Sequence, residues 1–129
     1  MSDDSKRLLL YQESGIEGNT NLGRLVVAFS STGTLNVDVA RNLNALESAD
    51  PTTYDAVLIA GNSGSFRRGD LEFALDYVHE LRGSGHDKNV FLAGPENGID
   101  STHVTQRYLA PNGVLNNSQA ESLVQRAFK

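Results

Sequence analysis

The chain has 129 residues, 39% of them hydrophobic, which suits one folded domain with a single core. Its formal net charge of −5 argues against a general nucleic-acid-binding protein, which needs a basic face, and the lack of cysteine excludes disulfides, thiolate catalysis and cysteine-bound metal centres. No apolar run has the length of a membrane span and the first residues do not resemble a secretory signal, so we expect one cytosolic domain over 1–129, with residues 1–5 as a flexible tail.

The N-terminal segment is the least regular part of the sequence. Residues 6–11 have the composition of a strand, but residues 13–23 show no helical periodicity that would carry a crossover connection. We therefore interpret residues 6–11 as a strand that pairs beside the next strand along the chain. It would take the place of a strand that is missing between residues 46 and 54.

The most informative segment is residues 25–34, where an apolar run breaks into hydroxyl residues and a glycine. These are Ser30, Ser31, Thr32, Gly33 and Thr34. The apolar residues that follow recur at helical spacing and predict a helix over 35–47, so a strand over 25–30 would lead directly into a helix. Backbone N–H groups and the positive end of the helix dipole meet there, which predicts a phosphate site, the alternative being a simple helix cap and turn.

Further elements follow in the same alternating order. We expect strands over 55–60 and 89–93, a very short fourth strand over 113–115, and helices over 70–82, from about 100 to 109, and over 118–127. Continuous apolar strands separated by amphipathic helices are typical of a parallel sheet covered on both faces. The sequence therefore predicts a three-layer α/β/α sandwich with a parallel sheet.

Polar, glycine-rich loops follow the three main predicted strands, beginning at Ser30, Gly61 and Gly94. In a parallel sheet these loops lie at the edge formed by the carboxyl ends of the strands, where ligands of such folds gather. We therefore expect a ligand site on that edge. The three histidines are scattered without ligand spacing, so a metal site is not expected.

The turn Phe29–Thr34, with the helix predicted after it, resembles the FMN-phosphate loop of flavodoxin-like proteins. It is most similar to that of the ribonucleotide-reductase-activating flavodoxins, the NrdI family. The loops over 61–66 and 92–98 are similar to the second and third flavin loops of that family. The resemblance covers roughly residues 24–128 and implies a flavodoxin-like fold.

The resemblance implies FMN as cofactor. The implied phosphate-binding residues are Ser30, Ser31, Thr32, Gly33, Thr34 and Leu35. The residues implied beside the flavin ring are Asn62, Ser63, Gly64, Ser65, Phe66, Gly94, Pro95, Glu96, Asn97 and Gly98. Phe66 would either stack on the ring or pack against the protein. The implied function is delivery of electrons or an O₂-derived oxidant to the metal subunit of a class Ib ribonucleotide reductase, with Arg67 and Arg68 at the docking rim.

The sequence also departs from the flavodoxin pattern. Leu35 stands where the longer flavodoxin loop has a second Thr, and the turn over 15–20 imitates the same loop but precedes the strand-like segment instead of a helix. The alternatives are a general electron-transfer flavodoxin and a flavodoxin-like binding module without flavin. The colour of the purified protein distinguishes a flavin-binding protein from a flavin-free one.

Two other classes share the expected layout. A phosphorylated receiver domain needs an acidic pair after the first strand and an acceptor Asp at the end of a later one, but those places hold Ser30-Ser31 and Gly61-Asn62. Phosphotransferase-system domains use a cysteine in the first loop, which this chain lacks. Both readings are disfavoured on these grounds.

Overall fold

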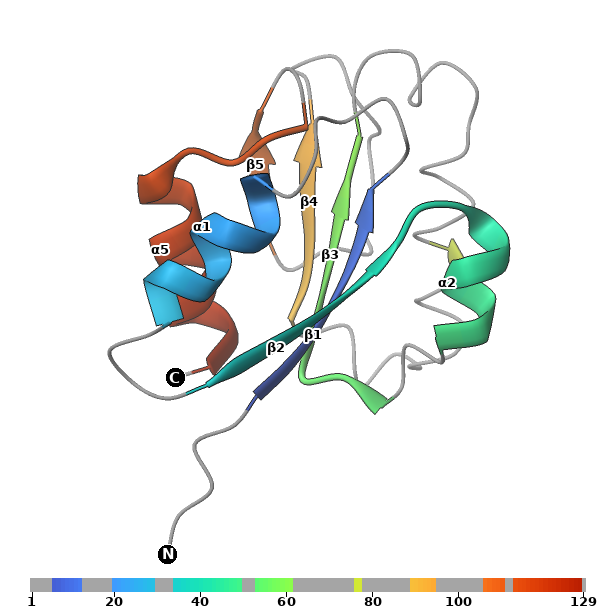
Figure 1. Ribbon diagram of the computed structural model, residues 1–129. Helices are drawn as coiled ribbons and strands as arrows, with labels where there is room; N and C mark the ends of the chain where they lie inside the picture. The colour runs from blue at the N-terminus through green and yellow to red at the C-terminus, as the bar shows by residue number, and fades with distance from the viewer. Residues whose placement is uncertain are drawn as a thin grey trace, which may run out of the picture.

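The computed structural model describes residues 6–12, 20–29, 34–49, 53–61, 76–77, 89–94, 106–110 and 113–128. Its strands are β1 (Lys6–Gln12), β2 (Leu35–Ala40), β3 (Ala56–Ala60), β4 (Val90–Gly94) and β5 (Gln106–Leu109), and its helices are α1 (Thr20–Phe29), α2 (Leu43–Ala49) and α5 (Asn117–Phe128). All five strands are parallel, in the order β2-β1-β3-β4-β5. Helices α1 and α5 cover one face of the sheet and α2 lies on the other (Figure 1). The predicted flavodoxin-like α/β fold is confirmed, because this is the strand order of that doubly wound class.

Strand β1 occupies the interior of the sheet. It pairs with β2 on one side and with β3 on the other, and Leu8, Leu9 and Leu10 are all fully buried. Three successive buried leucines require apolar layers on both faces, as a central parallel strand has. The predicted strand over 6–11 is therefore confirmed, but the prediction that it pairs beside a strand over 25–30 is wrong.

Residues 25–29 form the second half of helix α1 and not a strand. Leu22, Leu25 and Phe29 are spaced by three and four residues, and all three contribute to the core on one face of the sheet. Val27, on another side of the helix, is 73% exposed. A buried strand would bury both of its faces, whereas one face of this apolar run remains in solvent.

The predicted helix over 35–47 is wrong in its first half. Residues 35–40 form strand β2, in which Leu35, Val37 and Val39 face the α1 side of the sheet and alternate with polar residues. The chain then turns at Asn42, whose Oδ1 accepts a 2.8 Å hydrogen bond from the Ala45 backbone N–H and caps helix α2. The apolar spacing of this segment fits both the period of a helix and the period of a strand. Pairing with β1 favours the strand.

The later elements agree better with expectation. Strands β3 and β4 confirm the strands predicted over 55–60 and 89–93, and α5 confirms the helix over 118–127. The predicted fourth strand over 113–115 is wrong, as is the helical assignment of residues 106–109, which form edge strand β5. Of the helix predicted over 70–82, the structure describes Asp76 and Tyr77, both helical.

The core consists of two apolar layers, one on each face of the sheet. On the α1 and α5 side, Leu58 and Phe91 of the sheet join Leu25, Leu115 and Leu123. On the α2 side, the layer includes Leu9, Tyr11, Leu46, Ile59 and Leu92. Each fully buried leucine contributes about 1.5–3 kcal/mol of apolar transfer free energy.

None of the helices in the described part of the chain combines the length and apolar character needed to cross a membrane.

Candidate functional site

The carboxyl edge of the sheet, formed by the C-terminal ends of its strands, is the usual ligand position in this fold. One row of paired residues crosses this edge: Gln12 pairs with Ala60, Ala60 with Ala93, and Ala93 with Tyr108. All four side chains are buried. The two central positions, on β3 and β4, therefore carry only methyl groups.

Backbone hydrogen bonds continue the edge beyond this row. The Gly61 N–H donates to the Ala93 carbonyl at 3.0 Å, and the Ala110 N–H donates to the Gly94 carbonyl at 2.7 Å. None of the described residues at the ends of β1, β3, β4 and β5 carries a carboxylate, imidazole or ammonium group. No group of three or more potential metal-binding side chains occurs among the described residues either. These described strand ends therefore supply neither a carboxylate nor an imidazole that could bind a cation.

A buried pair of amides lies at the end of β1. Gln12 is fully buried and Asn21, on the first turn of α1, is 1% exposed. The Asn21 Nδ2 donates to Gln12 Oε1 at 3.3 Å and to the Gly113 carbonyl at 2.9 Å. Asn21 Oδ1 accepts from the Leu115 backbone N–H at 2.8 Å. These bonds satisfy the Asn21 amide, which explains how a polar side chain is tolerated in the core.

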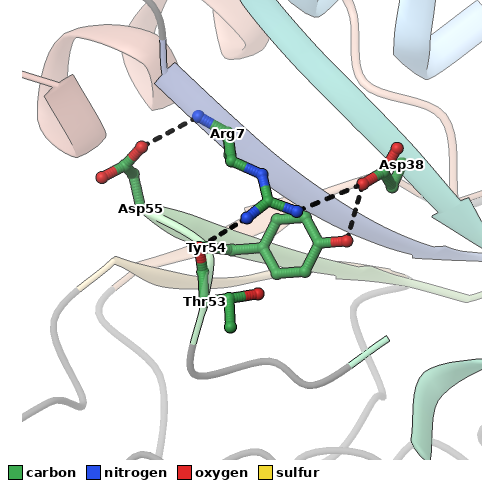
Figure 2. Close-up of polar contacts among 5 residues, drawn as sticks. All are labelled: Arg7, Asp38, Thr53, Tyr54 and Asp55. Atoms are coloured by element: carbon green, nitrogen blue, oxygen red, sulfur yellow. Dashed lines mark hydrogen bonds and ion pairs between the residues drawn. The ribbon is translucent and has the colours of Figure 1, made fainter. Parts of the chain in front are cut away.

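A second polar cluster surrounds Arg7, near the beginning of β1 and so at the opposite, amino edge of the sheet (Figure 2). The Arg7 guanidinium lies over the Tyr54 ring at 4.5 Å from its centroid and donates to the Thr53 carbonyl at 3.2 Å. Its Nη2 is 3.8 Å from Asp38 Oδ2, and the Tyr54 hydroxyl donates to the same oxygen at 2.7 Å. The Arg7 backbone N–H donates to Asp55 Oδ2 at 2.8 Å.

This amino-edge cluster fixes the chain as it enters β3. Side chains of Arg7 and Asp38 are 49% and 60% exposed, so their ion pair contributes at most about 1 kcal/mol. Burial, and then the hydrogen bond to Asp38, raise the pKa of the Tyr54 hydroxyl above its ordinary value. The phenol therefore stays neutral at physiological pH and acts as a hydrogen-bond donor, not as a base.

The first loop of the predicted FMN site follows a different element from the one expected. Ser30, Ser31, Thr32 and Gly33 lie outside the described residues, but the ends of their segment are defined: α1 ends at Phe29, and the Thr34 carbonyl accepts from the Lys6 N–H at 2.9 Å. The cluster thus follows a helix and leads into β2 at the amino edge of the sheet. Leu35 is buried in the core at 6% exposure. The predicted setting, after a strand and before a helix, is wrong.

The other two predicted loops follow neighbouring strands on the carboxyl edge. Asn62, Ser63, Gly64, Ser65 and Phe66 come after β3, and Pro95, Glu96, Asn97 and Gly98 come after β4; these nine, with Arg67 and Arg68, lie outside the described residues. Gly94 is described as the buried last residue of β4. That the residues after β3 and β4 contact a ligand or partner stays a prediction. In chain order, residues 30–34 lie between α1 and β2, whereas these two segments follow β3 and β4.

Comparisons with known proteins add one informative likeness. No protein-family model matches the sequence, and no curated protein matches it either. Among solved structures, the chain is similar to a signal receiver domain of a two-component signal transduction histidine kinase from Clostridium thermocellum, with a TM-score of 0.63 and 16% sequence identity. The likeness covers 96% of this chain and 98% of the receiver domain. At this identity it shows the fold, and function must be argued from the residues.

These findings correct the functional predictions. Membership of the NrdI family, FMN as cofactor, the redox function and the ribonucleotide reductase partner are all wrong, because residues 25–29 form a helix where the flavin loop would follow a strand, and the similar solved structure is a receiver domain. The alternative of a general electron-transfer flavodoxin is wrong as well, because it also requires FMN. The alternative of a flavin-free binding module agrees better with the structure.

Sequence reasoning missed both polar clusters. The partners of Asn21 are 9, 92 and 94 residues away, so no local pattern reveals them. A signal for the correct elements was present, however. The alternation of apolar and polar residues over 35–39 is a strand pattern, and a strand there requires residues 20–29 to form the helical crossover from β1.

Proposed function

We propose that this chain is a receiver-like signalling module that binds a protein partner and does not accept a phosphoryl group. The observation that carries the proposal is the end of β3. A phosphorylated receiver needs an acceptor Asp at the end of this strand. Here β3 ends at Ala60, and the next residues in the sequence are Gly61 and Asn62. Neither a methyl group, a glycine nor a neutral amide is a carboxylate nucleophile for phosphoryl transfer.

The metal chemistry of the carboxyl edge supports the same proposal. Phosphoryl transfer relies on Mg²⁺ held by carboxylate oxygens. With β1 as the first strand, the place of the acidic pair falls at Gln12 and Glu13, so the sequence supplies one carboxylate there instead of two. Gln12 is buried and its Oε1 already accepts a hydrogen bond from Asn21. A neutral amide oxygen that already accepts a hydrogen bond is a weaker ligand for Mg²⁺ than a carboxylate.

The likeness to a histidine kinase receiver domain suggests the class of partner. The likeness spans nearly the whole of both chains, so this fold has the architecture of a domain that receives a signal from another protein. We propose a two-component histidine kinase as the partner and the cytosol as the compartment. The chain would bind as a single domain, and binding would not depend on phosphorylation of this chain.

Phosphoryl uptake gives the first test. The purified chain is incubated with acetyl phosphate and Mg²⁺, beside a receiver domain that has the acceptor Asp, and both are measured by intact-protein mass spectrometry. We expect the control domain to gain one phosphoryl group and this chain to gain none. Addition of a phosphoryl group to an aspartate of this chain contradicts the proposal.

Partner binding gives the second test. The isotopically labelled chain is titrated with the purified catalytic part of a histidine kinase from the same genome, and backbone amide shifts are followed by nuclear magnetic resonance. We expect saturable shifts of equal affinity with and without ATP, and competition by a phosphorylatable receiver domain. If none of the kinases of the genome produces saturable shifts, the proposed partner class is wrong.

A further inference from the structure

Asn21 joins helix α1 to two other parts of the fold. Its amide touches the end of β1 through Gln12, and the segment between β5 and α5 through the Gly113 carbonyl and the Leu115 N–H. A backbone N–H only donates and a backbone carbonyl only accepts, so these contacts fix which end of the amide is oxygen. The Nδ2 group then has two acceptors for its two hydrogens. Asn21 cannot turn to improve one bond without losing another.

The segment that Asn21 holds is also held by a second side chain of α1. Leu115 donates its N–H to Asn21 Oδ1 and accepts a hydrogen bond at its carbonyl from the Arg24 guanidinium. Asn21 and Arg24 are one helical turn apart and so lie on the same side of α1. The Leu115 side chain is itself fully buried. This residue is therefore fixed at both backbone groups and at its side chain.

The position of Leu115 sets the beginning of α5. Asn116 caps the helix reciprocally with Gln119: Asn116 Oδ1 accepts from the Gln119 N–H at 2.8 Å, and Gln119 Oε1 accepts from the Asn116 N–H at 2.9 Å. Gln119 Nε2 also donates to the Leu109 carbonyl at 2.7 Å, which ties the first turn of α5 to the end of β5. Hydrogen bonds thus run from Gln12 through Asn21 to Leu115, and the peptide bond from Leu115 to Asn116 connects this set to the cap of α5.

We infer that Asn21 is a positioning residue that couples the carboxyl edge of the sheet, at Gln12, to the start of α5. Gln12 is the last residue of β1, so a partner or ligand that displaces the end of this strand also displaces the acceptor of one Asn21 hydrogen. The freed N–H belongs to a side chain that is 1% exposed, so leaving it without an acceptor costs free energy. Because buried hydrogen bonds reinforce one another, loss of this bond weakens the bonds to Gly113 and Leu115. The inference holds whatever partner binds.

Hydrogen exchange of the Leu115 amide measures this coupling directly. Gln12→Met keeps the length of the side chain but removes the acceptor. We expect the Leu115 amide to exchange roughly tenfold faster than in the wild type, as leaving a buried donor unsatisfied predicts. The Leu58 amide, in the centre of β3, reports global unfolding and should accelerate less. Glu121→Gln, an exposed change on α5, is the matched control and should leave Leu115 unchanged.

A double-mutant cycle separates coupling from general destabilisation. In an Asn21→Leu background, Gln12→Met should no longer accelerate exchange at Leu115, because the connection has already been removed. Equal acceleration in both backgrounds, or a Gln12→Met protein with wild-type exchange at Leu115, overturns the inference. If Asn21→Leu does not fold, the comparison of Leu115 with Leu58 in Gln12→Met still decides, since equal acceleration of the two amides means loss of stability without coupling.

Discussion

The Tyr54 hydroxyl donates a 2.7 Å hydrogen bond to Asp38 Oδ2, which joins the segment just before β3 to the middle of edge strand β2. The same carboxylate faces the Arg7 guanidinium, which lies over the Tyr54 ring. β1 lies between β2 and β3 in the sheet, so this cluster crosses β1. It orders the amino edge at a place where the chain enters the core.

This arrangement predicts an unusual tyrosine titration. Burial, and then Asp38, raise the pKa of the Tyr54 hydroxyl above its ordinary value of about 10. A raised pKa in the folded state stabilises the protein below pH about 10, and this contribution is lost as the pH rises through the folded-state value. Asp38→Asn should lower the Tyr54 pKa, because it removes the negative charge that opposes the phenolate. Phenolate absorbance against pH measures the effect.

Two further variants make the titration specific. Tyr54→Phe identifies the signal of this residue among the four tyrosines of the chain. Glu47→Gln, which removes a negative charge from exposed α2, should leave the Tyr54 titration unchanged. Identical curves for the wild type and Asp38→Asn would show that the carboxylate does not act on the phenol.

Two glycines should respond to alanine in opposite directions. Gly113 is buried with a φ of 74°, a left-handed conformation that costs an L residue about 1–2 kcal/mol, so Gly113→Ala should destabilise the fold by about that amount. Gly23 is exposed within α1 and has open space where a Cβ would lie, so Gly23→Ala should stabilise by about 0.5–1 kcal/mol. Urea denaturation of both variants tests the pair, and a destabilised Gly23→Ala protein would contradict the assignment of α1 as a helix.

Removal of the α5 cap should have a measurable effect on stability. Asn116→Ala loses the acceptor for the Gln119 N–H and should lower the free energy of unfolding by about 1 kcal/mol. Asn117→Ala, the neighbouring change at an exposed position, should stay within about 0.5 kcal/mol of the wild type. Thermal melting by circular dichroism compares the two, and equal melting temperatures would show that the cap is not needed.

The centre of the sheet should tolerate truncation poorly. Leu58 on β3 is fully buried in the layer beneath α1 and α5, so Leu58→Ala should lower the free energy of unfolding by about 2–5 kcal/mol. Asn36→Ala, at an exposed position of β2, should change it by less than about 0.5 kcal/mol. Chemical denaturation gives both values. Similar midpoints for the two variants would contradict the central position of β3.

Several features of this protein follow from the sequence by itself. The apolar runs over 56–60 and 90–93 have no alternation, which predicts strands buried on both faces, and parallel strands require helical crossovers. The apolar spacing and polar start of α5 likewise predict a helix close to its observed bounds. The fold class was therefore predictable, because it depends on patterns within short segments.

Only the tertiary structure decided which apolar run lies inside the sheet. Residues 25–29 satisfy both a strand and a helix pattern, and the choice depends on β1, which needs a helical connection before it can pair with parallel β2. That choice puts a helix before the hydroxyl residues over 30–34 and a strand after them, the reverse of the predicted order. The partners of Asn21 could not be predicted from the sequence either, because hydrogen bonds across 92 and 94 residues form only after the strands and helices have packed.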